Sequence, residues 1–254
     1  MNPFHLLGTW FLAECEATGQ RAYLLFQTLW TLFDALSKPR RIVVQMARVG
    51  WDSFPIIALM AVFTGMVVGL YSGRALENVG GERTQATIVS VALVKEMVPI
   101  LTGLLLAGRV GAAFAAEIGT MNVNEEIDAL TTLGVNPVSY LCTPRFLACL
   151  VMVPALVAYG NVIGIFGGAA VGSRYFNISY DAYIRIMADS IDARDILEGT
   201  TKAFLNGGII AIVACHRGFR ARGGAVGVGN AITGCVVDCF VWIFVANYFV
   251  TFTF

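Results

Sequence analysis

The chain has 254 residues, of which 57% are hydrophobic and 13% are charged, and its formal net charge at pH 7 is zero. Soluble domains carry about 25% charged residues, so this composition excludes an ordinary soluble domain and predicts an all-α integral membrane protein. The balanced charge gives no reason to expect nucleic acid as a partner.

Residues 21–36 form the first predicted element, an amphipathic helix. Gln27, Thr31 and Asp34 fall on one narrow polar stripe, while leucine and phenylalanine residues cover another face. The basic run KPRR, residues 38–41, follows directly. A broad apolar face with a basic end is typical of a helix that lies on the membrane surface. A short additional span and a helix packed on the bundle are the alternatives.

Five apolar runs follow, and each can cross a hydrocarbon core of about 30 Å, which takes about 20 helical residues. Helices are expected because lipid cannot satisfy backbone hydrogen bonds. The predicted spans are residues 54–71, 88–106, 146–171, 196–215 and 231–251. The chain therefore divides into an interfacial segment, residues 1–45, and a five-span membrane domain, residues 46–254.

The lysine and arginine residues between the spans predict the orientation, because cytoplasmic loops carry an excess of basic residues. About twice as many of them fall inside as outside when the N-terminus is placed in the cytoplasm. The sequence thus predicts a multi-pass protein with a cytoplasmic N-terminus and a C-terminus on the outer side. Residues 117–137 then lie in the cytoplasm.

Glycine and cysteine have recognisable places in the spans. Small residues four apart let helix backbones approach closely in lipid, either within one subunit or at a seam between two copies. Two such rows are Gly160, Gly164, Gly168 and Gly172, and Gly65, Gly69 and Gly73. The six cysteines lie in or beside apolar runs without a CxxC pair, so we interpret them as small apolar residues. The two histidines form no metal motif.

The polar stretch between the second and third spans predicts a short helix over residues 122–134. Asn122 fits an N-cap, with Glu125 three residues later as in a capping box. Gly134 is a fitting C-terminal stop. The acids near its N-terminal end, where the helix dipole favours negative charge, are Glu125, Glu126 and Asp128. The apolar stripe comprises Val123, Ile127, Leu130 and Leu133.

A helix of about three turns is too short to be stable alone in water. It is expected to dock either on its own bundle or on a separate cytoplasmic protein, and the spacing of its residues does not favour one of these over the other.

Lys95 and Glu96 lie in the middle of the predicted second span, three residues before Pro99. An ionisable residue at bilayer depth costs about 2.5–3.5 kcal/mol, so it should face protein, water or a polar ligand. Adjacent residues point about 100° apart and cannot share a helix face. Candidate partners are Lys202 in the fourth span and Asp238 in the fifth. The group suits a polar spot in a substrate path or an ion pair that fixes packing.

Other motifs of chemistry are weak. The glycine-rich run over residues 223–234 lacks the Lys-Ser/Thr of a phosphate-binding loop. No nucleophile–histidine–acid set and no metal-ligand cluster is recognisable in the sequence. The chain is therefore expected to be no enzyme and to bind no cofactor or metal of its own.

Residues 104–148, LLLAGRVGAAFAAEIGTMNVNEEIDALTTLGVNPVSYLCTPRFLA, resemble the MlaE/YrbE permease family. These are membrane subunits of bacterial inner-membrane ABC systems that work with MCE-domain lipid-binding proteins. The resemblance implies a homodimer whose central cavity receives a lipid, most readily a phospholipid, and opens toward an MCE assembly outside. It implies that ATP and Mg²⁺ are bound by a partner ATPase.

The same resemblance assigns roles to residues. The segment between the second and third spans is a coupling helix in this family, so ATPase contacts are expected from Glu117, Glu125, Glu126, Asp128 and Leu130. The charged pair of the second span is Arg-Glu in the family but Lys95-Glu96 here, and lysine binds phosphate through a point charge rather than a fork. Lys202 matches a family lysine. Lys95, Glu96 and Lys202 are expected to line or brace the headgroup path.

Two other functions are consistent with the same residues. An ion-coupled secondary transporter would use Lys95, Glu96 and Asp238, although an odd number of spans and the lack of a visible inverted repeat disfavour it. A membrane scaffold without a transport path would tolerate neutralisation of the intramembrane charges.

Overall fold

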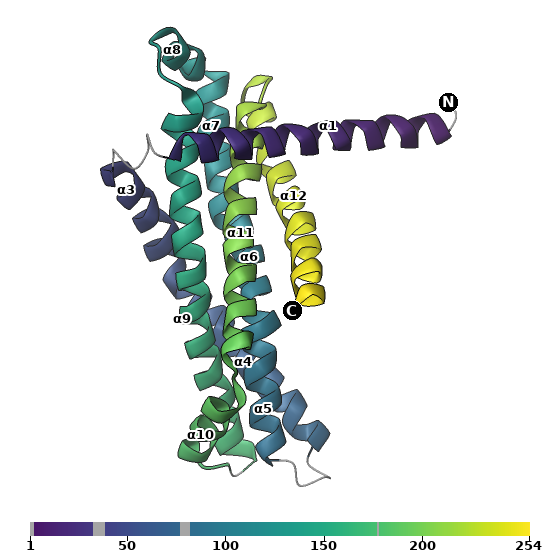
Figure 1. Cartoon of the computed structure of the whole chain (residues 1–254), viewed down its shortest axis with the longest axis vertical. Helices are drawn as coiled ribbons and strands as arrows, with labels where there is room; N and C mark the ends of the chain where they lie inside the picture. Colours follow the sequence, from purple (N-terminus) through teal and green to yellow (C-terminus); the bar gives the residue numbers. More distant parts are fainter. Residues whose placement is uncertain (1–2, 33–38, 77–81, 177) are drawn as a thin grey trace.

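The fold is a bundle of long helices that stand side by side, as Figure 1 shows. The computed structural model describes residues 3–32, 39–76, 82–176 and 178–254. Every regular element in these ranges is helical. Five continuous helical stretches are long and apolar enough to cross a membrane, which confirms the predicted five spans. They are Pro39–Leu76, Thr84–Val123, Val138–Tyr175, Ala193–Phe219 and Gly224–Thr253.

The stretches are built from shorter elements. Before and within the first two spans lie α1 (Pro3–Trp30), α3 (Pro39–Gly50), η1 (Trp51–Ser53), α4 (Phe54–Leu76), α5 (Glu82–Ala92), η3 (Leu93–Met97), α6 (Val98–Leu106), η4 (Ala107–Gly111) and α7 (Ala112–Val123). The remainder comprises α8 (Glu126–Thr132), η5 (Val138–Cys142), α9 (Thr143–Tyr175), α10 (Tyr180–Ser190), α11 (Ala193–Phe219) and α12 (Gly224–Thr253). The elements η3, η4 and η5 are π-helical turns.

Helices α8 and α10 lie at opposite ends of the bundle (Figure 1). We call these the α8 end and the α10 end. Helix α1 crosses the bundle at the α8 end, roughly perpendicular to the long helices, and its N-terminal part extends away from them (Figure 1). A helix that lies on a membrane surface needs this orientation relative to the spans, and the interfacial assignment stays a prediction.

The N-terminal helix is longer than residues 21–36, because α1 already begins at Pro3. The correction has a simple cause: residues 4–20 contain no proline that would end the helix before residue 21. Residues 33–36 of the predicted helix, with Asp34, lie outside the described residues. The C-terminal part of α1 docks on the start of the third span, where Thr28 Oγ1 lies 3.3 Å from Cys142 Sγ and Thr31 Oγ1 lies 2.9 Å from Thr143 Oγ1.

The glycine rows lie where α4 packs on α9 within one subunit. A Cβ atom on Gly65 would lie 1.9 Å from the carbonyl oxygen of Gly164, and one on Gly167 would lie 2.5 Å from that of Val62. The two backbones are thus in direct contact, which only glycine permits. Of the two explanations that the sequence left open for these rows, packing within the subunit is the one observed.

Helix α10 closes the far end of this contact. Its Tyr183 is fully buried, and its hydroxyl would lie 2.8 Å from a Cβ atom on Gly168. Burial raises the pKa of Tyr183 to about 12. The ring therefore acts as a neutral, space-filling group beside the glycines. Five of the six cysteines, Cys142, Cys149, Cys215, Cys235 and Cys239, are buried as thiols in the packed interior.

Candidate functional site

The acidic stretch forms α8, a helix of seven residues that projects beyond the long helices at one end of the bundle (Figure 1). The predicted start at Asn122 is wrong, because α7 runs on through Val123 and Asn122 belongs to it. The Asn122 amide does not cap a helix but donates a hydrogen bond of 2.9 Å to the carbonyl oxygen of Ala221. Glu125 precedes α8 instead, with a left-handed backbone at φ 61°.

The predicted role of Gly134 as the C-terminal stop is confirmed, although α8 itself ends at Thr132. Gly134 has φ 74°, the left-handed conformation that glycine adopts without strain. The N–H of Val135 donates to the carbonyl oxygen of Leu130 at 3.0 Å, and the N–H of Gly134 donates to that of Thr131. These bonds are those of a Schellman-type end, which satisfies the last carbonyl groups of the helix.

Helix α8 is attached by one face and exposed on the other. Ile127 is buried against the bundle and Leu130 is half-buried, while the side chain of Leu133 is 77% exposed. The acids Glu125, Glu126 and Asp128 are all exposed. The helix therefore docks on its own subunit and still offers a surface that is acidic with an apolar end. Leu133, which the sequence pattern assigned to the docked stripe, belongs to this free surface because the helix ends at Thr132.

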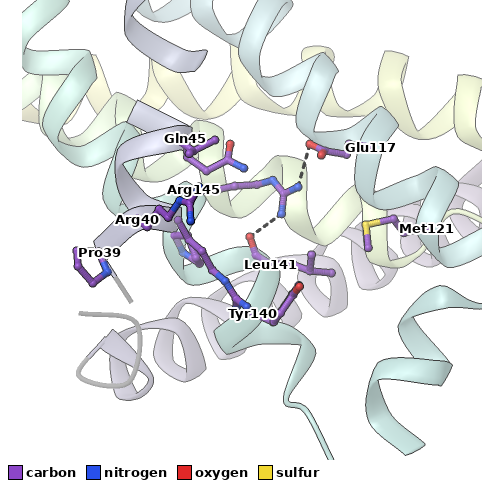
Figure 2. Close-up of a pocket in the computed structure, with 11 residues that line it drawn as sticks. Pro39, Arg40, Gln45, Glu117, Met121, Tyr140, Leu141 and Arg145 are labelled. Carbon is purple, nitrogen blue, oxygen red and sulfur yellow. Dashed lines mark hydrogen bonds and ion pairs between the residues drawn. The ribbon is translucent and has the colours of Figure 1, made fainter. Parts of the chain in front are cut away.

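Glu117 lies on α7 and is held by arginines of its own chain. Its carboxylate accepts from Arg145 Nη2 at 2.9 Å and from Arg48 Nη1 at 3.1 Å (Figure 2 shows the Arg145 contact). Arg145 also donates to the carbonyl oxygen of Leu141 at 2.7 Å. The three side chains join α7, α9 and α3. The contact of Glu117 with an ATPase stays a prediction, and the interaction observed is with this chain.

A second polar group lies among the spans, around the predicted pair of the second span. Lys95 Nζ lies 3.1 Å from Asp195 Oδ1 and 3.1 Å from Glu198 Oε2, both on α11. Its side chain is 33% exposed. Neither Asp195 nor Glu198 was assigned a role from the sequence. The spacing of Glu198 and Lys202, four residues apart on one helix, was the available signal.

Lys202 is the centre of this group, and its side chain is completely buried. Its ammonium lies 2.6 Å from Glu96 Oε1 and 2.8 Å from Glu198 Oε1, and it donates to the carbonyl oxygen of Lys95 at 2.9 Å. All three ammonium protons thus have acceptors. The predicted pairing of Lys202 with the second-span charges is confirmed.

Pro99 explains why the carbonyl oxygen of Lys95 is free to accept from Lys202. In a regular α-helix this oxygen would accept from the N–H four residues later, but proline has none and its ring crowds that carbonyl. The chain forms the π turn η3 over Leu93–Met97 at this place. Gly199 allows α11 to come close, since a Cβ atom there would lie 2.4 Å from the carbonyl oxygen of Val94.

Glu96 faces α12 as well as α11. Its carboxylate accepts from Asn247 Nδ2 at 2.9 Å and from Thr251 Oγ1 at 2.8 Å, and its side chain is 31% exposed. Asp195 is in the first turn of α11, and Thr251 is in the last turn of α12. The sequence-based placement of Lys95 and Glu96 at the middle of the second span is therefore wrong. The pair lies level with the start of α11 and the end of α12.

The five charged groups of this ion cluster, Lys95, Glu96, Asp195, Glu198 and Lys202, comprise two cations and three anions. Lys202 and Glu198 are sealed from solvent, whereas Lys95 and Glu96 are each about one-third exposed. The buried pair can only brace the helices. The exposed pair offers one cation and one carboxylate from adjacent residues, each of them also paired with another member of the cluster.

Asp238 was expected as a partner of the second-span charges, and this expectation is wrong. Its carboxylate accepts from Arg217 Nε at 2.7 Å and Nη2 at 2.9 Å and also pairs with Arg21 of α1. Arg217 follows Lys202 by fifteen residues on α11, or about 22 Å along the helix. The ion-coupled transporter hypothesis needed Asp238 beside Lys95 and Glu96, and the fold places it elsewhere.

Asp238→Asn is expected to loosen α1 from the bundle. The substitution removes the anion between Arg21 and Arg217 and leaves two cations facing each other, a change that costs about 3 kcal/mol when such a pair is largely buried. Faster hydrogen exchange in residues 15–30 would report it. Glu16→Gln is the control, because Glu16 is exposed and bonds only to Gln20 among the described residues; equal exchange in both variants contradicts the assignment.

Comparison with known proteins identifies the family. The profile of the family described as Permease MlaE matches residues 42–253. A protein of Rickettsia typhi named "Probable ABC transporter permease protein" is 36% identical over 99% of this chain and 97% of its own length. A Synechocystis protein of the same name is 34% identical over 97% of this chain and 92% of its own length.

A third relative carries a more specific name. The "Intermembrane phospholipid transport system permease protein MlaE" of Haemophilus influenzae is 31% identical over 93% of this chain and 91% of its own length. The matches cover the five spans, α8 and the ion cluster, and the family profile spans more than half of the chain. On these grounds the chain belongs to the MlaE permease family.

Proposed function

We propose that this chain is the permease subunit of an ABC transporter that moves phospholipids between a bacterial inner membrane and an MCE-domain protein. The names of the Rickettsia and Haemophilus relatives support transport driven by an ATPase and a phospholipid cargo. The observation that carries the proposal is α8, a short helix docked through Ile127 whose exposed acids and exposed Leu133 have no partner within the described residues. A cytoplasmic ATPase that binds Mg²⁺ and ATP is the proposed partner.

The orientation follows from the same assignment. If α8 meets a cytoplasmic ATPase, the α8 end is cytoplasmic, α1 lies along the inner surface, and the α10 end faces outward. The C-terminal end of α12 and the ion cluster are then on the outer side of the bilayer centre, where an MCE-domain protein would receive the lipid.

Movement of α8 has two physical routes into the spans. Asn122, at the base of the helix, bonds to Ala221 in the turn between α11 and α12. Glu117, on the same α7, is paired with Arg145 of α9. If movement of α8 rotates α7, these contacts would transmit the rotation to α9, α11 and α12. The side chains of Asn122, Glu117 and Arg145 are buried or half-buried and therefore have little freedom to absorb it.

The cluster near the outer side suits the headgroup path. Lys95 and Glu96 are the reachable members, and they would meet the phosphate and the ammonium of a zwitterionic headgroup, respectively. Lys202 is buried and would brace the path without contacting the lipid. An apolar cavity of about 410 Å³ lies between α1, α9, α11 and α12. Its lining includes Leu25, Phe146, Phe204 and Trp242, and such an apolar lining would suit lipid acyl chains. We propose that the transporter contains two copies of this chain.

Glu126→Arg combined with Leu133→Asp is expected to abolish ATPase binding and lipid transfer in a reconstituted complex. Both side chains are exposed, so the fold should persist, while the free surface of α8 changes its charge and loses its apolar end. Co-purification of the ATPase and transfer of labelled phospholipid to an MCE-domain protein are the measurements. The matched control is Asp189→Arg with Tyr175→Asp, the same charge change at the α10 end. Normal coupling in the α8 variant would exclude α8 as the ATPase contact.

A further inference from the structure

A cavity of about 680 Å³ lies at the α8 end, separate from the ion cluster. It is bounded by the start of α3, by α7, by the π turn η5 and by the start of α9. Figure 2 shows the side chains that converge on it. Its polar lining comprises Arg40, Arg41, Gln45, Glu117, Tyr140 and Arg145.

The cavity has a surplus of positive charge. Among the described residues that line it, three arginines face a single carboxylate, and that carboxylate, Glu117, is already paired with Arg145 and Arg48. Among the described residues no carboxylate lies within ion-pair distance of Arg40 or Arg41. Arg41 is held in place, since its guanidinium carbon lies 4.0 Å from the centre of the Tyr140 ring. An arginine stacked in this way keeps its N–H edges free to bind a phosphate through two hydrogen bonds.

Two buried polar atoms in the cavity wall lack a partner within the described part of the chain. They are Oε1 of Gln45 and Nε of Arg145. Buried polar groups are nearly always hydrogen-bonded, and an exception points to a missing ligand or water. A bound group that carries both an anion and a hydroxyl or ammonium donor would satisfy both atoms.

The rest of the lining is apolar and continuous with a membrane-facing helix. Val44, Met121 and Leu141 line the same cavity. On α3, Val43 and Val44 are exposed, and exposed Trp51 follows at its end. Trp, basic residues and an apolar face together are typical of the boundary between headgroups and acyl chains. A free phosphate ion would gain nothing from the apolar walls, whereas a phospholipid would use both parts.

We propose that this cavity binds the phosphate of an anionic phospholipid in the leaflet at the α8 end, with Arg40 and Arg41 as the main contacts. The lipid is a resident ligand that ties α3 to η5 and α7, and it lies apart from the transported lipid. Calling that leaflet cytoplasmic rests on the proposed function; the site itself does not.

The test is lipid binding by the full chain in neutral detergent, followed by native mass spectrometry with short-chain phosphatidylglycerol as the probe. Arg40→Gln with Arg41→Gln is expected to weaken binding about tenfold or more, because two charge-assisted contacts are lost. Both side chains are exposed, so folding should be unaffected. The control is Arg220→Gln with Arg222→Gln, which removes two exposed arginines elsewhere at the α8 end and should bind as the wild type does.

Three outcomes would overturn the proposal. Wild-type affinity in the Arg40/Arg41 variant excludes these residues as contacts. An equal loss in the Arg220/Arg222 control shows a general charge effect rather than a site. Displacement of phosphatidylglycerol by equimolar inorganic phosphate makes the site one for the free anion. None of these measurements involves ATPase coupling or lipid transfer, so failure here is distinguishable from failure of the proposed function.

Discussion

Gly65→Ala is expected to be among the most damaging single substitutions in the bundle. The added Cβ atom would lie 1.9 Å from the carbonyl oxygen of Gly164 and 3.1 Å from the backbone nitrogen of Gly168. Both obstacles are backbone atoms that cannot turn aside, so α4 and α9 must separate. Overpacking of a tight core costs about 1–3 kcal/mol, and we expect a loss at or above the upper value. The thermal midpoint of the detergent-solubilised protein is the measurement.

Gly69→Ala is the matched control, one turn further along α4 in the same row. Its Cβ atom would lie 3.5 Å from the nearest atom of Gly168, which is an ordinary contact distance. The midpoint should change little, and a more helix-favouring residue even offsets some of any loss. If both alanines lower the midpoint equally, the separation of α4 from α9 is not set by the approach of Gly65 to Gly164.

Lys202→Met is expected to destabilise the protein by about 3–5 kcal/mol, the usual result of removing one partner from a buried ion pair. The variant keeps the volume but leaves the carboxylates of Glu96 and Glu198 without the cation that lies 2.6 and 2.8 Å from them. It also removes the Lys202 donor from the carbonyl oxygen of Lys95, which cannot accept from Pro99. Denaturant unfolding in mixed micelles would measure the change in free energy.

Two companions make this prediction specific. Lys95→Met removes an equal charge from the same cluster, but its side chain is one-third exposed and water can replace it, so the loss should be much smaller. Adding Glu198→Gln to Lys202→Met should recover part of the stability, because Glu198 is then a buried carboxylate that keeps only the partly exposed Lys95 as a cation among the described residues. Equal losses in the two lysine variants, with no recovery, would show that Lys202 is not the central cation.

The five spans could be predicted from sequence because lipid leaves few options. A long apolar run that enters a bilayer must satisfy its backbone internally, and a helix does this locally. The stop after α8 was also predictable from the local sequence, because Gly134 adopts the left-handed backbone that ends a helix. Both features depend on residues that are close in the sequence.

Most features that depend on residues distant in the sequence were not predicted, although the pairing of Lys202 with Glu96 was. Asn122 looks like a cap, yet its amide finds Ala221, ninety-nine residues later in the sequence. From its place in an apolar span, Asp238 was expected to pair with the charges of the second span, yet its ion pairs are with Arg21 of α1 and Arg217 of α11. Which long side chains meet depends on how the helices are rotated and offset, and no local pattern contains that information.

Pro99 was a signal that could have been used further. Proline in the interior of a helix predicts an unpaired carbonyl four residues earlier, here on Lys95, and therefore a donor from another helix. The donor is Lys202. The acids on the free surface of α8 were named from the sequence. Leu133 was assigned to the docked stripe instead, and it is exposed because the helix ends at Thr132.

The ion cluster also constrains the order in which the chain can be assembled during translation. Glu96 is joined by Lys202 and by Asn247, which follow it by 106 and 151 residues. At about 5–20 residues per second, a ribosome makes Asn247 on the order of ten seconds after Glu96. For the first 106 residues of that interval the carboxylate of Glu96 lacks its cation, Lys202, and until the end of the interval it lacks the amide of Asn247. Nascent chains should therefore stay beside the insertion machinery until the last helix has emerged, and release into lipid should follow only then.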